Sequence, residues 1–358
     1  NINCTRSDKD MGGTWTNQNK ILPGAYLNFR TNAPLSITLG ERGTVVILQE
    51  VSKGASGEMY KITALDQSKW PTGVTAEDKL LANEALKGAN TVIVYNLGAE
   101  HTSEVVEQAL AKLMTEDFNV LVYPYDGAAY DTIKTTIKAW VDMMRTEEGK
   151  KIQAVMANFA ADDEAIINVT QGVRLVDGTE LTAAQTTAWV GGVTAGAAIN
   201  QSNTGRKYIG AIDVVPRMTK TEMEAAVQNG EFIFKVDTAQ NVTVIYDINS
   251  LTTVTAEKGK QFTKNRVIRT LDGINNDIVE IFESNYVGKV NNNADGRSLL
   301  RATLIEYFNE LQRLNAIQNF TAEDVTVSPG NDSDAVVIDC YIQPVDSVEK
   351  IYITVNLS

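Results

Sequence analysis

The fold is decided by three apolar runs: TVIVYN at residues 91–96, FNVLVY at 118–123 and KIQAVMAN at 151–158. Two segments between them, Ser103–Thr115 and Tyr130–Glu147, carry apolar residues at helical spacing. Strand–helix–strand repeats of this length predict a mainly parallel sheet with helices on its faces.

The sequence on either side of this repeat has a different character. Short apolar runs bounded by glycine and proline precede it, and alternating strands around two long helices follow it. We therefore predict a multidomain fold of class α/β plus α+β. The expected parts are an N-terminal arm at 1–24, a β-rich small domain at 25–74, an α/β domain at 75–235, an α+β C-terminal domain at 236–345 and a C-terminal arm at 346–358. Further helices are expected at Ala76–Lys87, Ala183–Ile199, Leu271–Tyr286 and Ser298–Ala316, and further strands at Thr44–Val51, Met59–Leu65, Ala165–Val169, Asn241–Asn249, Val336–Gln343 and Lys350–Leu357.

Composition excludes several classes of protein. The chain has 358 residues, 43% of them hydrophobic, and a formal net charge of −13. Such an acidic chain does not fit a nucleic-acid or anionic-membrane surface, which needs clustered Lys and Arg. Two cysteines and one histidine cannot build a disulfide framework or a cysteine-rich zinc site. The polar N-terminus has no apolar signal core, so we expect a protein made and kept in a cytoplasm.

Motifs for catalysis or cofactor binding are missing from the sequence. No Gly-Lys pair has the spacing of a phosphate-binding loop, and Gly191–Gly196 lies in a small-residue helix, where close helix packing is expected. Asn291–Gly296 imitates the start of a calcium loop, but Ala302 stands where the bidentate Glu should be, which favours a helix N-cap. His101 is expected to be solvated or to cap a helix. We predict no catalytic residue, no cofactor and no metal.

One basic stretch stands out against the acidic whole. Residues 258–269 hold five basic side chains and no acid. A contact with an acidic protein partner or a neighbouring subunit is the functional reading that we favour over nucleic acid. The five side chains are Lys258, Lys260, Lys264, Arg266 and Arg269.

The C-terminal segment Lys350–Leu357 alternates apolar and polar residues to its end. A strand with one apolar face must pair and bury that face. It could pair within its own chain beside Val336–Ile342, or add to the sheet of another molecule. An extended segment at each end and no active site are features of a polymer subunit.

A series of short motifs runs through the chain in a specific order and spacing. They are GGTWT at 12–16, PGAYLNF at 23–29, GERG at 40–43, GKKIQAV at 149–155, DINSLT at 247–252, KNRVIR at 264–269, NDI at 276–278, GKV at 288–290, DGR at 295–297 and EKIYITV at 349–355. In these motifs the chain resembles contractile phage tail sheath proteins, and within them the small-sheath type of Gram-positive prophages and phage-like particles such as the defective Bacillus particle PBSX. The resemblance covers residue 12 to the end. Met11 resembles the first residue of the family, and residues 1–10 do not fit it, so we suspect that they are a leader.

The resemblance implies a structural subunit that forms stacked hexameric rings around a tail tube and contracts to drive the tube through a target envelope. It implies that the terminal arms add strands to neighbouring subunits, with the tail tube, baseplate and tail terminator proteins as further partners and assembly in the bacterial host cytoplasm. No nucleic acid or membrane contact is expected. The arm residues expected to join subunits are Trp15, Tyr26, Phe29, Ile351, Tyr352, Ile353, Val355 and Leu357. The expected electrostatic contacts to the tube or a neighbouring subunit are the five basic residues named above with Arg297 and Arg301.

Two alternatives stay open at this point. An α/β enzyme would use the crevice at the strand ends, near Tyr123–Tyr130 or Asn158–Asp163. Another tail structural protein, from the tube or baseplate, would be a shorter chain richer in β-structure.

Overall fold

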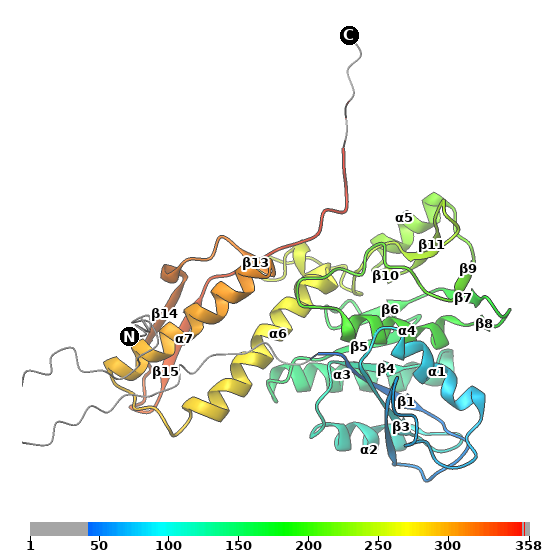
Figure 1. Cartoon of the computed structure of the whole chain (residues 1–358), viewed down its shortest axis with the longest axis horizontal. Helices are drawn as coiled ribbons and strands as arrows, with labels where there is room; N and C mark the ends of the chain where they lie inside the picture. The colour runs from blue at the N-terminus through cyan, green and yellow to red at the C-terminus, as the bar shows by residue number, and fades with distance from the viewer. Residues whose placement is uncertain (1–41, 353, 355–358) are drawn as a thin grey trace, which may run out of the picture.

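A seven-stranded sheet forms the centre of the molecule (Figure 1). The computed structural model describes residues 42–352 and residue 354. The strand order is β10-β6-β5-β4-β1-β3-β2, and every neighbouring pair is parallel except β2 with β3. The strands are β1 (Thr44–Gln49), β2 (Met59–Thr63), β3 (Thr91–Asn96), β4 (Val120–Tyr123), β5 (Gln153–Ala157), β6 (Ile166–Val169) and β10 (Glu231–Phe232).

Helices cover both faces of this sheet, which explains why its strands are continuous apolar runs. In β1, Val45 and Ile47 belong to the core on one face, and Val46 and Leu48 to the core on the other. A strand buried on both faces has no polar side to alternate with. The first face is covered by α1 (Ala76–Leu86) and α4 (Ala183–Gly196), and the second by α2 (Ser103–Leu113) and α3 (Asp131–Thr146).

The glycines of α4 allow this helix to lie directly against α1. A Cβ atom on Gly192 would stand 2.1 Å from the carbonyl oxygen of Ala85, and one on Gly88 would stand 2.6 Å from the Cα of Val193. The expectation of close helix packing at Gly191–Gly196 is confirmed.

Small antiparallel sheets cover the outer side of α4. Trp189 of α4 stacks on Tyr208, with ring centroids 4.3 Å apart, and Phe234 packs edge-on against Trp189. The elements of this outer layer are β7 (Gly172–Leu175), β8 (Glu180–Leu181), β9 (Ala211–Val215), α5 (Lys220–Gln228), β11 (Phe234–Val236) and β12 (Val242–Val244).

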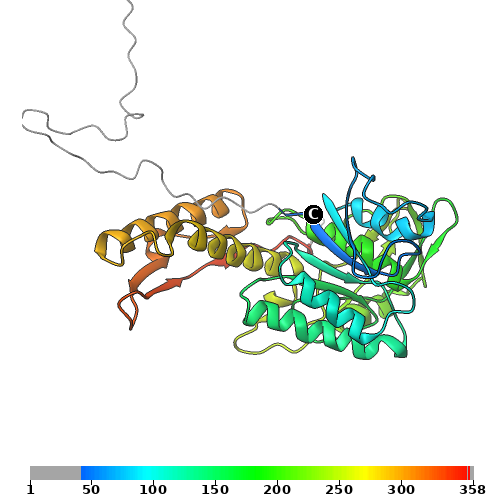
Figure 2. The same ribbon diagram turned by 90° about the horizontal axis from the view of Figure 1, so that it is seen from below.

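Residues 265–344 form a separate lobe with its own core (Figure 2). Leu304, Tyr307, Phe308 and Leu311 of α7 are almost fully buried in it, so this face of the helix packs into the core. The lobe contains α6 (Asn265–Ile281), a π-helical turn at Phe282–Tyr286, α7 (Ala294–Arg313), and the strand pairs of β13 (Ile317–Gln318) with β16 (Gln343–Pro344) and of β14 (Val325–Pro329) with β15 (Val336–Cys340). Short 3-10 turns lie at Ala128–Tyr130, Lys260–Thr263 and Ala322–Asp324.

The α/β and α+β fold class is confirmed, while three expectations need correction. Residues 44–63 do not form a small domain of their own, because β1 lies between β3 and β4 in the main sheet and β2 pairs with β3. The strand expected at Asn241–Asn249 is limited to β12. After β12 the chain contacts the start of α6, where the side chain of Asn265 donates to Asp247. Helix α6 begins at Asn265, six residues before the expected start. Its first turns carry polar side chains that are nevertheless buried, so they lack the apolar spacing that predicts a helix.

Candidate assembly site at the base of the C-terminal arm

The chain leaves the C-terminal lobe beyond β16. There the backbone N–H of Val345 donates to the carbonyl of Ala316 over 2.9 Å. Burial then alternates: Val345, Ser347 and Glu349 are half-buried, while the residues between them are exposed. This segment, residues 345–349, is called the arm base below.

Glu349 is fixed by two parts of the body. Thr204 Oγ1, in the loop after α4, donates to Glu349 Oε1 over 2.6 Å. Lys264 Nζ, at the start of α6, contacts Glu349 Oε2, and the two side chains are only 10% and 6% exposed. The ammonium group also lies 3.6 Å from the ring centroid of Tyr246. Burial lowers the pKa of Lys264, but the hydrogen bonds to Glu349 and Tyr246 and the charge of Glu349 outweigh burial and raise this pKa above its ordinary value.

Ser347 is bound by the next basic residue of α6. Arg266 donates from one terminal nitrogen to Ser347 Oγ over 2.7 Å and from the other to the carbonyl of Asn315 over 3.2 Å. One guanidinium therefore joins the arm base to the turn between α7 and β13.

Beneath this layer, Arg269 is fully buried. Its side chain donates to the carbonyls of Thr194 and Gln201 over 3.3 and 2.6 Å and lies 3.5 Å from Asp247. Asp247 also accepts from the backbone N–H of Asn203 over 2.9 Å. The positive charge of Arg269 is thus balanced by Asp247 inside the molecule, where α6 meets α4 and the segment that follows β12.

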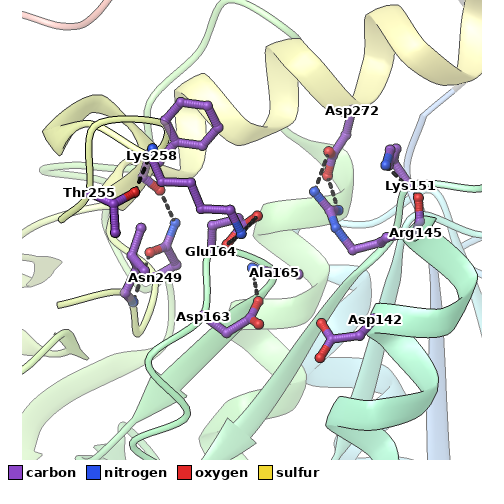
Figure 3. A network of polar contacts seen from close by, with 12 residues as sticks. Asp142, Arg145, Lys151, Asp163, Glu164, Ala165, Asn249, Thr255, Lys258 and Asp272 are labelled. Atoms are coloured by element: carbon purple, nitrogen blue, oxygen red, sulfur yellow. Dashed lines mark hydrogen bonds and ion pairs between the residues drawn. The ribbon is translucent and has the colours of Figure 1, made fainter. Parts of the chain in front are cut away.

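A second polar network holds α6 against the α/β body (Figure 3). Arg145 of α3 donates in a bidentate pair to Asp272 of α6, over 2.7 and 2.8 Å. Burial lowers the pKa of Arg145, but the charge and hydrogen bonds of Asp272 outweigh burial and raise this pKa. At the other end of the network Lys258 pairs with Glu164 over 2.7 Å. These ion pairs join the α/β body to α6 and to the loop that precedes it.

Beyond the arm base the exposure of the chain changes. Lys350, Ile351 and Tyr352 follow one another as exposed residues, with Ile351 74% and Tyr352 90% accessible. Figure 1 shows this segment leading away from the body. An apolar pair in water after a buried polar anchor is typical of a segment that binds another molecule.

Three family models match the chain. The model of the phage tail sheath protein central domain matches residues 72–250, and the model of the phage tail sheath C-terminal domain matches residues 257–358. The N-terminal region of domain III of the tail sheath protein Gp18 matches residues 42–97. The chain belongs to the phage tail sheath protein family.

Similar proteins come from several bacteria and phages. The phage-like element PBSX protein XkdK of Bacillus subtilis is 30% identical over 97% of this chain and 100% of its own length. The tail sheath protein of Clostridium phage phiCD119 is 32% identical over 83% of this chain and 82% of its own length. The crystal structure of a sheath tail protein from Desulfitobacterium hafniense is 36% identical, with a TM-score of 0.81 over 92% of this chain and 99% of that one. The sheath protein described here is therefore a structural component of a phage or phage-like tail and not an enzyme.

The basic residues singled out in the sequence lie in two different settings. Lys264, Arg266 and Arg269 are at most 9% exposed and bind groups of their own chain, so these three do not present free charges for the expected contacts to a tube or neighbouring subunit. Lys264 and Arg266 face the arm base, and Arg269 faces the α/β body. Lys258 and Lys260 are exposed, and Arg297 and Arg301 are half-buried, with Arg297 donating to Asn292 Oδ1 and Arg301 to the carbonyls of Val325 and Ala322.

Most of the expected arm residues lie outside the described part of the sheath protein. Ile351 and Tyr352 are described and exposed. The others are Trp15, Tyr26, Phe29, Ile353, Val355 and Leu357.

His101 corrects a further expectation. Its side chain is inaccessible to solvent; Nδ1 lies 2.7 Å from Glu50 Oε1 and Nε2 lies 2.8 Å from Tyr123 Oη. Tyr125 and Tyr130 pack against the same ring. Aromatic side chains therefore fill the carboxyl ends of β1, β3 and β4, where an α/β enzyme would open its crevice.

Three features of other protein classes can be assessed in the described residues: a cleft, a metal site and a membrane-spanning helix. A cleft of about 1170 Å³ opens at the amino ends of the strands, beside α6. No group of three His, Cys, Asp or Glu side chains in the described ranges could hold a metal ion, and no helix there is long and apolar enough to cross a bilayer. Asn293 caps α7 by accepting from the Gly296 N–H over 2.8 Å, as the sequence led us to expect for the calcium-like segment.

Sequence reasoning missed the residues that hold the arm base. Glu349, Ser347 and Thr204 were not singled out. One signal was present: the alternation that puts Ile351 on the apolar face of the expected strand puts Glu349 on the same face. An acid on an apolar face needs a buried partner, and Lys264 provides it.

Proposed function

We propose that this sheath protein polymerises as stacked hexameric rings around a tail tube, linked by exchanged terminal strands, and contracts to drive the tube through a target envelope. The observation that carries the proposal is the C-terminal segment, which is anchored at the arm base and then presents Ile351 and Tyr352 to solvent. An apolar segment that leaves its own chain in this way suits strand addition to a second copy.

The C-terminal lobe offers places where such a strand could be added. Among the described residues β14 and β15 pair only with each other, and α7 packs on β14. Val336 and Val337 of β15 are 39% and 47% exposed. A two-stranded sheet is marginal in water, so a third strand at its open edge would stabilise it. Residues 236–345 would then be the assembly domain, with residues 346–358 as its exchanged arm.

Contraction and the wider set of partners are part of the same proposal. The fold is shared, at 15% identity and a TM-score of 0.71, with the helical sheath of the anti-feeding prophage in its contracted state. Tail tube, baseplate and tail terminator proteins would be the partners, with assembly in the bacterial host cytoplasm. Lys258, Lys260, Arg297 and Arg301 remain the candidates for contacts to the tube or a neighbouring subunit; exposed pairs of this kind contribute only ~0–1 kcal/mol each and so can be released.

Two truncations test the arm. Deletion of residues 351–358 keeps the anchored arm base and removes the exposed segment, whereas deletion of everything after Asp346 removes Ser347 and Glu349 as well. We expect both to give folded subunits that form no sheaths by negative-stain electron microscopy, while the full chain forms striated cylinders. The chain that ends at Asp346 should also unfold at a lower temperature, because Lys264 loses its partner Glu349. Cylinders from the deletion of residues 351–358 would refute the exchange of C-terminal strands.

A further inference from the structure

The arm base divides the C-terminal segment into a part held by its own chain and a part that is free to leave. Up to Glu349 every second residue turns inward and finds a partner: Val345 at Ala316, Ser347 at Arg266, and Glu349 at Lys264. From Lys350 onward the described residues are exposed without this alternation.

Glu349 is the most strongly held residue of the arm base. Its carboxylate uses both oxygens, one for Thr204 Oγ1 and one for Lys264 Nζ, and its side chain is 6% exposed. The Thr204 hydroxyl in turn accepts from the backbone N–H of Asp247 over 3.0 Å, and the backbone N–H of Thr204 donates to Ser202 Oγ over 3.1 Å. A charge buried in this way is stable only while both partners stay in place.

The partners of Glu349 come from different parts of the molecule. Thr204 lies in the loop that follows α4 of the α/β body, whereas Lys264 begins α6 of the C-terminal lobe. Because Arg269 and the Arg145–Asp272 pair join these same two parts, the carboxylate binds a rigid junction and not a single mobile loop.

We propose that Glu349, Lys264 and Thr204 form a clamp that fixes where the C-terminal arm leaves the subunit, so that residues up to Glu349 stay with their own chain and residues from Lys350 onward go to a second copy. The clamp residues are positioning residues: they bind one another within the chain and set the direction from which the exchanged strand departs. The inference rests on the proposed function and adds to it the boundary of the exchanged segment.

The arm must bond to a second subunit and stay attached to its own, and the clamp assigns these two roles to different residues. Strand addition supplies backbone hydrogen bonds between subunits, but any pull along the arm is transmitted to the subunit through its last internal contact. With Glu349 intact that contact is an ion pair at the junction of body and lobe, next to the buried guanidiniums of Arg266 and Arg269. Without it, the last internal contacts are those of Ser347 and Val345.

Charge removal tests the clamp. Glu349→Gln leaves Lys264 buried without its counter-charge and should reduce the yield of sheaths by about tenfold or more. Asp346→Asn is the matched control, since it makes the same chemical change three residues earlier on an exposed carboxylate that accepts only from the Ser347 N–H. The exchanged pair Glu349→Lys with Lys264→Glu should recover part of the yield. Circular dichroism of the subunits checks that each variant is folded.

Cross-linking in assembled sheaths tests the boundary directly and does not depend on whether Glu349 variants fold. Ser202→Cys with Val348→Cys, in a chain in which Cys4 and Cys340 are replaced by Ser, places a thiol two residues before Thr204 and leaves all three clamp side chains in place. A short bis-maleimide should then link the two positions within one chain, so that denaturing gels show single subunits. A ladder of linked subunits, or equal sheath yields from Glu349→Gln and Asp346→Asn, would overturn the clamp. Deletion of residues 351–358 would still decide strand exchange separately.

Discussion

Asp78 shows at the scale of one residue how the fold uses a carboxylate. Its two oxygens accept from the backbone and side chain of Ser52 over 2.9 and 2.6 Å and from those of Thr75 over 2.8 Å each. Burial raises the pKa of Asp78, but these hydrogen bonds outweigh burial and lower it from 3.8 to about 2. A lowered pKa stabilises the folded state above pH 3.8, and this contribution is lost as the pH falls toward 2.

We therefore expect Asp78→Asn to lower the free energy of unfolding near neutral pH by about 1–2 kcal/mol. The difference from the parent chain should shrink as the pH falls from 3.8 to 2. Urea unfolding at several pH values measures it, and Glu77→Gln, an exposed neighbour in the same helical turn, serves as control. A difference that stays constant over this range would contradict the assigned role.

The basic residues show which part of a site can be predicted from sequence at this scale. The run from Lys258 to Arg269 was recognisable as a local excess of positive charge, but the direction of each side chain was not. Direction depends on how α6 is rotated against the body, and the acids that meet the buried side chains are Asp247 for Arg269 and Glu349 for Lys264, both outside the basic run. A run of basic residues can be buried when acidic residues from other parts of the sequence pair with it, and no pattern within the run indicates which residues these are.

At the scale of elements, the periodicity of the sequence predicted well where helices and strands lie, and poorly which strands pair with one another. The bounds expected for β3 are those found, and α3 starts and ends within a residue of expectation. The place of β1 between β3 and β4 could not be predicted, because strand order is a property of the packed sheet and not of any single run. The early start of α6 was missed because Asn265 and Arg266 are polar yet buried.

The attachment of α6 to the body leads to a prediction about the Arg145–Asp272 pair. Arg145→Met leaves the carboxylate of Asp272 buried without its partner, which should destabilise the chain by about 3–5 kcal/mol. Arg145→Met with Asp272→Leu removes both charges and should recover most of this loss. Denaturant unfolding measures both, and Arg217→Met, which breaks an exposed pair with Asp213, should cost less than about 1 kcal/mol. Equal losses in Arg145→Met and Arg217→Met would show that the buried pair does not hold α6.

At the scale of the whole molecule, the chain combines a packed body with an arm whose described residues beyond Glu349 are exposed. Two apolar cores hold the sheet and its helices together, and a third holds the C-terminal lobe together. Ile351 and Tyr352 are 74% and 90% exposed, so the described part of the arm leaves apolar surface uncovered. If this segment adds to the sheet of a second copy, its backbone N–H groups matter more than its side chains.

Proline substitution separates these two contributions. Ile351→Pro and Tyr352→Pro each remove one backbone N–H, and because neighbouring residues of a strand point their N–H groups to opposite edges, one of the two must block a bond to the neighbour. A blocked bond leaves a carbonyl of the neighbour unpaired and should cost about 1–3 kcal/mol, which corresponds to about 5- to 150-fold in subunit affinity. Ile351→Thr and Tyr352→Thr keep the donor and the β-propensity and should assemble far better. The measurement is the subunit concentration at which sheaths appear in light scattering and microscopy. Proline and threonine variants that assemble at the same concentration would show that the arm is held by its side chains and not as a strand.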